Sequence, residues 1–335
     1  MKACLTIVLV LIGALIGAGF ASGQEIYSFF YVYGVSGLFG IILTCILISL
    51  TIYKTLKIIC NNNIDNYDDF LKVFIKSEKV TKIINNILNI LLLVTFYIMI
   101  AGFGAYFEQE IGINKIIGSG ILAVLSSIVF FTNVKGVLKV SQFIVPILIV
   151  LIIIIGSINL FSIDHNIEIP KIKNGWMLSS ISYCSYNMIL LIPVLISIKK
   201  QITRKTNIKY IAIISGILMI IMSIMLYMML TKVDVDISTL EMPIVYVITY
   251  FFAHFKMVYA FIVLSSIFTT AISIGIGFLQ NISKSKKSYT QFVLFMCITS
   301  LIICNFGFSK LVNFVYPLFG YIGILQLIFI IKQKS

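Results

Sequence analysis

The first hydrophobic segment holds the residues with the clearest potential for chemistry. Four glycines fall within eleven residues, at Gly13, Gly17, Gly19 and Gly23, and the carboxylate of Glu25 follows them. Glycine is the poorest ordinary helix former, so this spacing predicts a helix that opens. An opened helix in a bilayer exposes backbone groups that need a partner. Secondary transporters hold substrates and ions at such breaks.

The two ends of an opened helix suit different ligands. We expect the carbonyl groups of Gly13 and Ile16 to face a cation such as Na⁺. The N–H groups of Gly17, Ala18 and Gly19 would face a carboxylate, because the start of a helix favours negative charge. An α-amino acid carries an ammonium group and a carboxylate on one carbon and fits this pair of ends. The alternative is a small-residue packing face, which is common in membrane helices.

Glu25 lies in the outer third of the same segment. A carboxylate is costly there and is a functional candidate by default. If it is shielded from water, Glu25 could carry a coupling proton. The alternative places it at the outer headgroup level, where it is solvated and ordinary.

A second polar group lies on a later apolar segment. Ser266, Thr269, Thr270 and Ser273 are spaced i, i+3, i+4 and i+7, so their hydroxyls share one helical face. Such a face could bind a cation. The alternative is that the hydroxyls bond back to carbonyls of their own helix.

The composition identifies the class of protein that must position these residues. The chain has 335 residues, of which 60% are hydrophobic and 11% charged, whereas a soluble domain carries roughly a quarter charged residues. The chain is therefore predicted to be a polytopic, all-α membrane protein whose surroundings are the lipid bilayer. The net charge of +13 does not indicate nucleic-acid binding, because the lysines lie in short loops and Arg204 is the single arginine.

Ten segments are long and apolar enough to span a membrane, which takes about 20 residues. They lie at 4–30, 36–60, 84–107, 115–133, 138–161, 177–198, 208–231, 255–280, 288–306 and 310–332. Two amphipathic pieces, 64–81 and 236–253, are predicted to lie at a membrane surface or over a vestibule.

The positive-inside rule fixes the orientation of these spans. With a cytoplasmic N-terminus, 19 of the 25 Lys and Arg fall on the cytoplasmic side. The six on the outer side are Lys115, Lys171, Lys173, Lys232, Lys256 and Lys310. Both termini are therefore predicted to be cytoplasmic.

Ten spans divide into two halves of five with opposite topology, approximately 1–165 and 170–335, within a single transporter domain covering 1–335. Inverted repeats place discontinuous helices at corresponding positions, which predicts a second break near Ser185 in span six. Ser185 and Asn187 would then contact the substrate, with Tyr186 and Tyr97 as aromatic gates. The alternative is that these polar residues hold helices together by hydrogen bonds.

Four stretches carry a resemblance to known families. The stretch Gly13–Phe20 resembles the first-helix signature of amino acid–polyamine–organocation (APC) transporters, which share the LeuT fold. The stretches 17–25, 101–110 and 134–136 resemble bacterial YkvI-type membrane proteins, and the likeness extends over the whole chain in length and span count.

The resemblance implies a LeuT-like 5+5 inverted repeat with discontinuous helices one and six. In LeuT-fold sodium symporters, first-helix carbonyls and hydroxyls of span eight form a sodium site. By this resemblance, Na⁺ would lie between Gly13 and Ile16 on one side and Ser266, Thr269 and Thr270 on the other. No other cofactor is expected.

These observations favour a secondary active transporter of a small solute, an amino acid or a related compound, coupled to Na⁺ or H⁺. The alternative is a membrane receptor or sensor that uses the same fold without net transport. An enzyme is not expected, because no intramembrane nucleophile–base pair or metal-ligand set is present, and His165 and His254 lie in outer regions. The sequence does not determine an oligomeric state.

Overall fold

The computed structural model describes residues 2–132, 137–161, 172–202, 207–233, 235–283 and 285–333. The motif at 134–136 and His165 lie outside these residues. Helices form all the regular structure of the described residues, and no strand occurs among them. The predicted all-α class is confirmed for this part of the chain.

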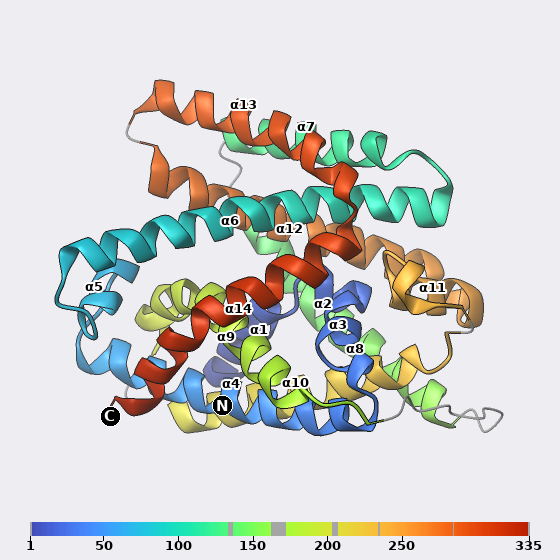
Figure 1. Ribbon diagram of the computed structural model, residues 1–335, viewed down its shortest axis with the longest axis horizontal. Helices are drawn as coiled ribbons and strands as arrows, with labels where there is room; N and C mark the ends of the chain where they lie inside the picture. The colour runs from blue at the N-terminus through green and yellow to red at the C-terminus, as the bar shows by residue number, and fades with distance from the viewer. Residues whose placement is uncertain are drawn as a thin grey trace.

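The chain forms a series of long helices with short ones between them (Figure 1). Their bounds are α1 Lys2–Leu15, α2 Ala18–Ser22, α3 Gln24–Phe29, α4 Val35–Asn61, α5 Tyr67–Lys72, α6 Glu78–Tyr106, α7 Lys115–Thr132, α8 Val137–Phe161, α9 Trp176–Ser197, α10 Ile208–Leu230, α11 Pro243–Phe251, α12 Lys256–Ile282, α13 Lys286–Ile303 and α14 Phe308–Lys332.

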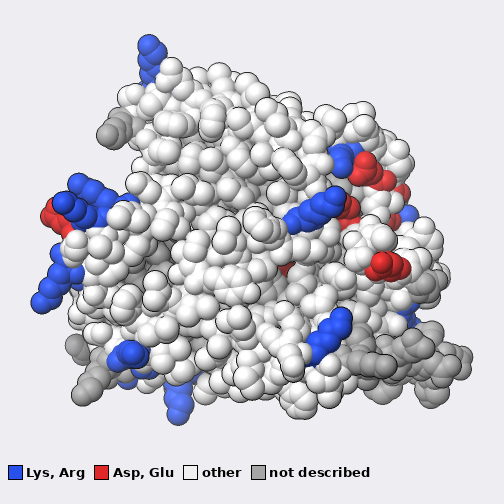
Figure 2. Space-filling model, viewed as in Figure 1, with Lys and Arg blue, Asp and Glu red and all other residues white. Residues whose placement is uncertain are grey.

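Within the described residues, eight helical segments have the length and hydropathy to cross a membrane. They are Val35–Asn61, Glu78–Ile111, Lys115–Thr132, Trp176–Ser197, Ile208–Leu230, Ala253–Ile282, Lys286–Phe306 and Phe308–Lys332. Two shorter apolar helices, Cys4–Leu15 and Ile144–Leu160, lie in the first and fifth predicted spans. Charged side chains gather toward the two ends of the long axis in Figure 2, and few lie between them. A helical membrane protein is thus confirmed, and the count of ten spans stays a prediction.

The long helices pack as two groups. In the first, α1 and α4 each pack against both α9 and α10; in the second, α6, α7, α12 and α13 all pack against one another. Figure 1 shows α7 and α13 along one edge of the molecule and α4 and α10 along the opposite edge. Two further helices join the groups, since α8 contacts α1, α10 and α12, and α14 contacts α4, α6 and α9. Helix α2, also in the first predicted span, contacts α6 and α12, so this span reaches both groups.

Span six is continuous, so the predicted discontinuity near Ser185 is wrong. Helix α9 runs without interruption from Trp176 to Ser197, and Pro193 lies inside it. The Ser185 hydroxyl donates to the Ile181 carbonyl at 2.7 Å, one turn earlier. These polar side chains find acceptors on their own helix, and no glycine is present to favour another backbone conformation.

The two amphipathic pieces form only short helices. In 64–81, α5 covers six residues, and its Phe70 and Leu71 are buried. In 236–253, a single 3₁₀ turn at Ile237–Thr239 precedes α11. Burial of apolar side chains holds both pieces on the helices beneath them.

Helices α9 and α14 approach closely because α14 presents glycine. A Cβ atom at Gly320 would lie 2.0 Å from the Ser182 hydroxyl oxygen and 2.5 Å from the Ser182 carbonyl oxygen. A Cβ atom at Gly120 of α7 would meet no atom of the described residues within 4 Å. The first glycine is therefore required by packing and the second is not.

We expect Gly320→Ala to lower the free energy of unfolding by about 1–3 kcal/mol, because the added methyl group overpacks a fixed helix contact. The matched control Gly120→Ala should leave stability unchanged or slightly raised. Thermal unfolding of the purified protein in detergent measures both. Equal melting temperatures for the two variants would contradict the close α9–α14 contact.

Candidate functional site

Span one is broken, as the glycine spacing predicts. Helix α1 ends at Leu15 and α2 begins at Ala18, with Gly17 in an extended conformation between them (φ −83°, ψ −175°). The N–H of Ile16 still donates to the carbonyl of Ile12 at 2.8 Å. The last carbonyls of α1 and the first N–H groups of α2 have no partner further along their own helix, so the break exposes polar backbone inside the bundle.

The glycines around the break have different roles. A Cβ atom at Gly13 would lie 2.9 Å from a methyl carbon of Val145 on α8, so this glycine permits helix packing. A Cβ atom at Gly17 would meet no described atom within 4 Å. Gly17 therefore borders open space at the break itself. The packing interpretation holds for the first glycine but not for the second.

A second turn follows α2 and brings Glu25 back toward the break. Gly23 has a positive φ of 84°, which L side chains rarely adopt, and it separates α2 from α3. A Cβ atom at Gly19 would lie 2.3 Å from the Glu25 carboxylate oxygen Oε1. Only glycine leaves room for that carboxylate against the first turn of α2.

Glu25 is buried, with 2% of its surface exposed. Its Oε2 atom accepts a hydrogen bond from the Tyr183 hydroxyl of α9 at 2.7 Å. Among the described residues, no Lys or Arg forms an ion pair with Glu25. A buried carboxylate with one neutral donor needs a proton or a cation to offset its desolvation.

Aromatic side chains of α9 pack on their neighbours near this carboxylate. Tyr186 of α9 stacks on Tyr316 of α14 with ring centroids 4.2 Å apart. The Tyr183 ring packs against Phe29 and Phe30, at centroid distances of 4.9 and 5.2 Å. Tyr183 is thus packed between apolar rings while its hydroxyl bonds to Glu25.

The other predicted substrate residues are placed differently. The Asn187 amide donates to the Tyr183 carbonyl at 2.9 Å, within its own helix. The Ser185 hydroxyl likewise donates to the Ile181 carbonyl of the same helix. The Tyr97 hydroxyl lies 2.6 Å from the Thr299 hydroxyl of α13. Ser185 and Asn187 are thus bonded within α9, and Tyr97 is bonded to α13. Tyr186 lies on the same helix as Tyr183, the donor to Glu25.

The hydroxyl face of α12 is partly engaged by its own backbone. The Thr269 hydroxyl donates to the Ser265 carbonyl at 3.0 Å, and the Ser273 hydroxyl donates to the Thr269 carbonyl at 2.8 Å. Helix α12 also reaches the broken segment, because the Tyr259 hydroxyl donates to the Ala21 carbonyl at 2.6 Å. Ser266 is buried and Thr270 half-buried on the same helix. The sodium site between α12 and the first helix stays a prediction.

The segment 236–251, which holds α11 and is called the outer segment after its predicted side of the membrane, is clamped to the end of span three. The amide side chain of Gln109 pairs with both backbone groups of Met242, accepting its N–H at 2.9 Å and donating to its carbonyl at 3.1 Å. Glu110 accepts from the Thr249 hydroxyl and lies 3.6 Å from the Lys256 ammonium group. These contacts hold α11 against the end of the spans.

A polar network links the same segment to the residue beside Glu25. The Gln24 amide donates to the Ser309 hydroxyl at 2.8 Å and to the Asn313 side chain at 3.0 Å. The Ser309 N–H donates to the Glu241 carboxylate at 2.6 Å. A change at Glu25 can therefore reach the outer segment through its neighbour in the chain.

The outer segment begins with its own cap. The Asp236 carboxylate accepts the Ser238 N–H at 2.9 Å, and hydrogen bonds from Ser238 lower the pKa of Asp236 below its ordinary value. This carboxylate therefore remains ionised at neutral pH and fixes the turn that leads to α11.

Comparison with known proteins places the chain in a family. No family model matches it. The uncharacterized membrane protein YkvI of Bacillus subtilis (strain 168) is 30% identical over 324 residues, which cover 94% of this chain and 91% of YkvI. The chain belongs to the YkvI family of membrane proteins. The uncharacterized protein YyaD of the same strain is 26% identical over 331 residues, covering 96% of this chain and 94% of YyaD.

The YkvI-family chain also resembles a solved transporter in fold. The structure of MHP1, a nucleobase-cation-symport-1 family transporter in a closed conformation with bromovinylhydantoin bound, superposes with a TM-score of 0.54 at 11% identity. The match covers 96% of this chain and 71% of MHP1. At this identity the likeness establishes a shared helical fold.

Sequence reasoning missed several residues of the YkvI-family site. Tyr183, the donor to Glu25, lies in the polar midsection of span six, beside residues that the sequence did single out. Tyr316 and Ser309 carry no local signal, because they reach the site from the last helix. Gln109 follows span three directly, and its position at a helix end was the available signal.

We expect Tyr183→Phe to reduce the free energy of unfolding of the YkvI-family protein by about 1–3 kcal/mol, since the buried carboxylate would lose its hydrogen-bond donor. The control Tyr321→Phe should have little effect, because Tyr321 is 49% exposed. Thermal unfolding in detergent measures both losses. In a Glu25→Gln background, the cost of Tyr183→Phe should shrink. An unchanged cost there would show that the donor acts elsewhere.

Proposed function

We propose that this YkvI-family protein is a secondary active transporter of a small solute, an amino acid or a related compound, coupled to Na⁺ or H⁺. The observation that carries the proposal is Glu25: a carboxylate buried at the break of a membrane helix, with one neutral donor and no ion-pair partner among the described residues. Ionisable groups inside membrane bundles mark ion pathways and proton relays.

The position of Glu25 favours coupling between substrate and cation. Its carboxylate lies against Gly19, in the first turn of the short helix α2. A substrate carboxylate at the N–H groups of Gly17, Ala18 and Gly19 would be repelled by an ionised Glu25. Binding of such a substrate together with a proton removes the repulsion, and this favours H⁺ as the coupled ion.

Na⁺ is the alternative coupling ion in this proposal. Its ligands would be the carbonyls of Gly13 and Ile16 and the hydroxyls of Ser266, Thr269 and Thr270. The open space beside Gly17 and the contact between α2 and α12 support a site in this region. Tyr186 would lie over the bound substrate, with Ser185, Asn187 and Tyr97 further from it.

The same proposal includes the LeuT-like inverted repeat of the APC superfamily, with repeats at approximately 1–165 and 170–335. The packing supports it, because exchanging α1 for α9, α4 for α10, α6 for α12, α7 for α13 and α8 for α14 leaves the main contacts between helices in place. The group α1, α4, α9 and α10 would rock against α6, α7, α12 and α13. The proposed location is the bacterial cytoplasmic membrane, with both termini cytoplasmic.

Uptake of a labelled amino-acid panel into proteoliposomes tests the proposed function. With an imposed H⁺ or Na⁺ gradient, we expect at least one amino acid or related compound to accumulate, and dissipating the gradient should stop the accumulation. Binding without accumulation under either gradient would contradict transport and favour the sensor.

For H⁺ coupling, we expect Glu25→Gln to abolish accumulation driven by a proton gradient, because an amide side chain does not bind and release a proton near neutral pH. Substrate exchange across the membrane at equal pH should continue, since the neutral side chain imitates the protonated state. Glu108→Gln is the control and should accumulate substrate at the wild-type level, because Glu108 is exposed near the end of the same helical segment. Gradient-driven accumulation by Glu25→Gln at the wild-type level would refute the role of Glu25.

For Na⁺ coupling, Thr270→Ala removes one proposed ligand. We expect the stimulation of uptake by Na⁺ to disappear, measured as the dependence of the initial rate on external Na⁺. Thr290→Ala on α13 is a suitable control, because its hydroxyl is bonded to the Lys286 carbonyl of the same helix. If the Na⁺ response of Thr270→Ala equals that of the wild type, the sodium site is excluded.

A further inference from the structure

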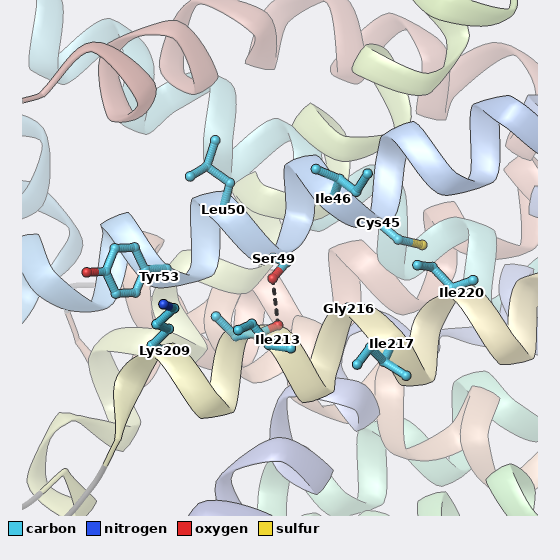
Figure 3. A pocket seen from close by; sticks show the side chains of 11 residues that line it. Cys45, Ile46, Ser49, Leu50, Tyr53, Lys209, Ile213, Gly216, Ile217 and Ile220 are labelled. Carbon is cyan, nitrogen blue, oxygen red and sulfur yellow. Dashed lines mark hydrogen bonds between the residues drawn. The ribbon is translucent and has the colours of Figure 1, made fainter.

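A groove lies between α4 and α10 on the outside of the bundle (Figure 3). Its volume is about 580 Å³, within the range of roughly 300–1,000 Å³ that ligand pockets have. Apolar side chains line most of it, among them Ile46, Leu50, Ile213 and Ile217. Ile46 is 55% exposed and Ile217 50% exposed, so this wall faces the surrounding lipid and not the interior of the bundle.

A direct contact between the two helices forms the floor of the groove. The Ser49 hydroxyl donates to the Ala212 carbonyl at 2.8 Å, as the dashed line in Figure 3 shows. A Cβ atom at Gly216 would lie 3.0 Å from the Cβ of Ser49, so the helices are in contact at this point. Because the floor is fixed, the larger side chains on either side leave a trough between them.

One end of the groove is basic. Lys209 and Tyr53 line it where α10 begins and α4 approaches its end. The Lys57 ammonium group lies 4.9 Å from the centroid of the Tyr53 ring. Among the described residues, neither lysine forms an ion pair with a carboxylate. Two cations at one end of an apolar trough complement an anionic head attached to a hydrocarbon chain.

The length of the groove fits one leaflet. Its lining on α10 runs from Lys209 to Ile220, and at 1.5 Å per residue this covers roughly 16 Å. The hydrocarbon core of a bilayer is about 30 Å thick, so the trough extends over about half of it. The groove is therefore about as long as one leaflet is thick, and a groove that ran across the whole membrane would be about twice as long.

We propose that the groove between α4 and α10 binds one anionic phospholipid, with an acyl chain along the apolar trough and the phosphate beside Lys209 and Lys57. Basic pockets between membrane helices recognise anionic lipid headgroups in this way. Zwitterionic lipids fill the trough equally well but lack the net negative charge, so the site selects by headgroup.

Native mass spectrometry of the full-length protein in detergent tests the site, with phosphatidylglycerol and phosphatidylethanolamine as probes of matched chains. We expect one molecule of phosphatidylglycerol to bind tightly and phosphatidylethanolamine to bind more weakly. The double variant Lys57→Gln and Lys209→Gln should weaken phosphatidylglycerol binding roughly 25-fold, at about fivefold per lysine, and leave phosphatidylethanolamine unchanged. The matched control, Lys286→Gln with Lys287→Gln on α13, should retain full affinity.

A second variant tests the trough. Ile217→Trp fills the groove from its lipid-facing wall. It should weaken the binding of both lipids without lowering the melting temperature of the protein. Soluble glycerol 3-phosphate should not compete, because it lacks the acyl chain. The proposal would be overturned if the Lys57–Lys209 and Lys286–Lys287 double variants lost equal affinity for phosphatidylglycerol. It would also be overturned if neither Ile217→Trp nor the Lys57–Lys209 double variant changed that affinity. Competition by glycerol 3-phosphate would replace it with a free-phosphate site.

Discussion

A carboxylate buried in a membrane helix bundle needs local compensation, because neither water nor lipid can solvate its charge. In this protein that carboxylate is Glu25, and the surrounding structure depends on it. Gly23 turns the chain so that Glu25 points back toward the break. Gly19 leaves room for the carboxylate, and Tyr183 donates a hydrogen bond from a helix distant in the sequence. One neutral donor does not offset the desolvation of an ionised carboxylate, which needs a proton or a cation in addition.

The same arrangement connects the surroundings of Glu25 to the segment that holds α11. Gln24 is the chain neighbour of Glu25 and bonds to α14 through Ser309. The backbone of Ser309 donates to Glu241 in the outer segment, and Gln109 holds that segment to the end of span three. Glu25 is thus one residue away from the contacts that hold α11. In the proposed transport cycle, ion binding at Glu25 would use this link to change which side is open.

Much of the fold follows from hydropathy, since lipid requires each crossing segment to be helical. Eight of the predicted spans therefore correspond, within the described residues, to helical segments long and apolar enough to cross a membrane, and the glycine segment does break. Span six was mispredicted for a related reason. Symmetry predicted a break near Ser185, but the local chemistry allows Ser185 and Asn187 to bond to their own helix. Polar residues in a span indicate a need for partners and do not say where those partners lie.

The sequence by itself determined the membrane class, the helical segments, the break between Leu15 and Ala18, and Glu25 as a candidate. These depend on composition and on backbone preferences, which are local properties. The tertiary structure decided what each polar group contacts. It brought the Tyr183 hydroxyl to Glu25 and the Tyr97 hydroxyl to Thr299 of α13, and it left an apolar groove with a basic end between α4 and α10. Those contacts join residues far apart in the chain, and packing alone sets their distances.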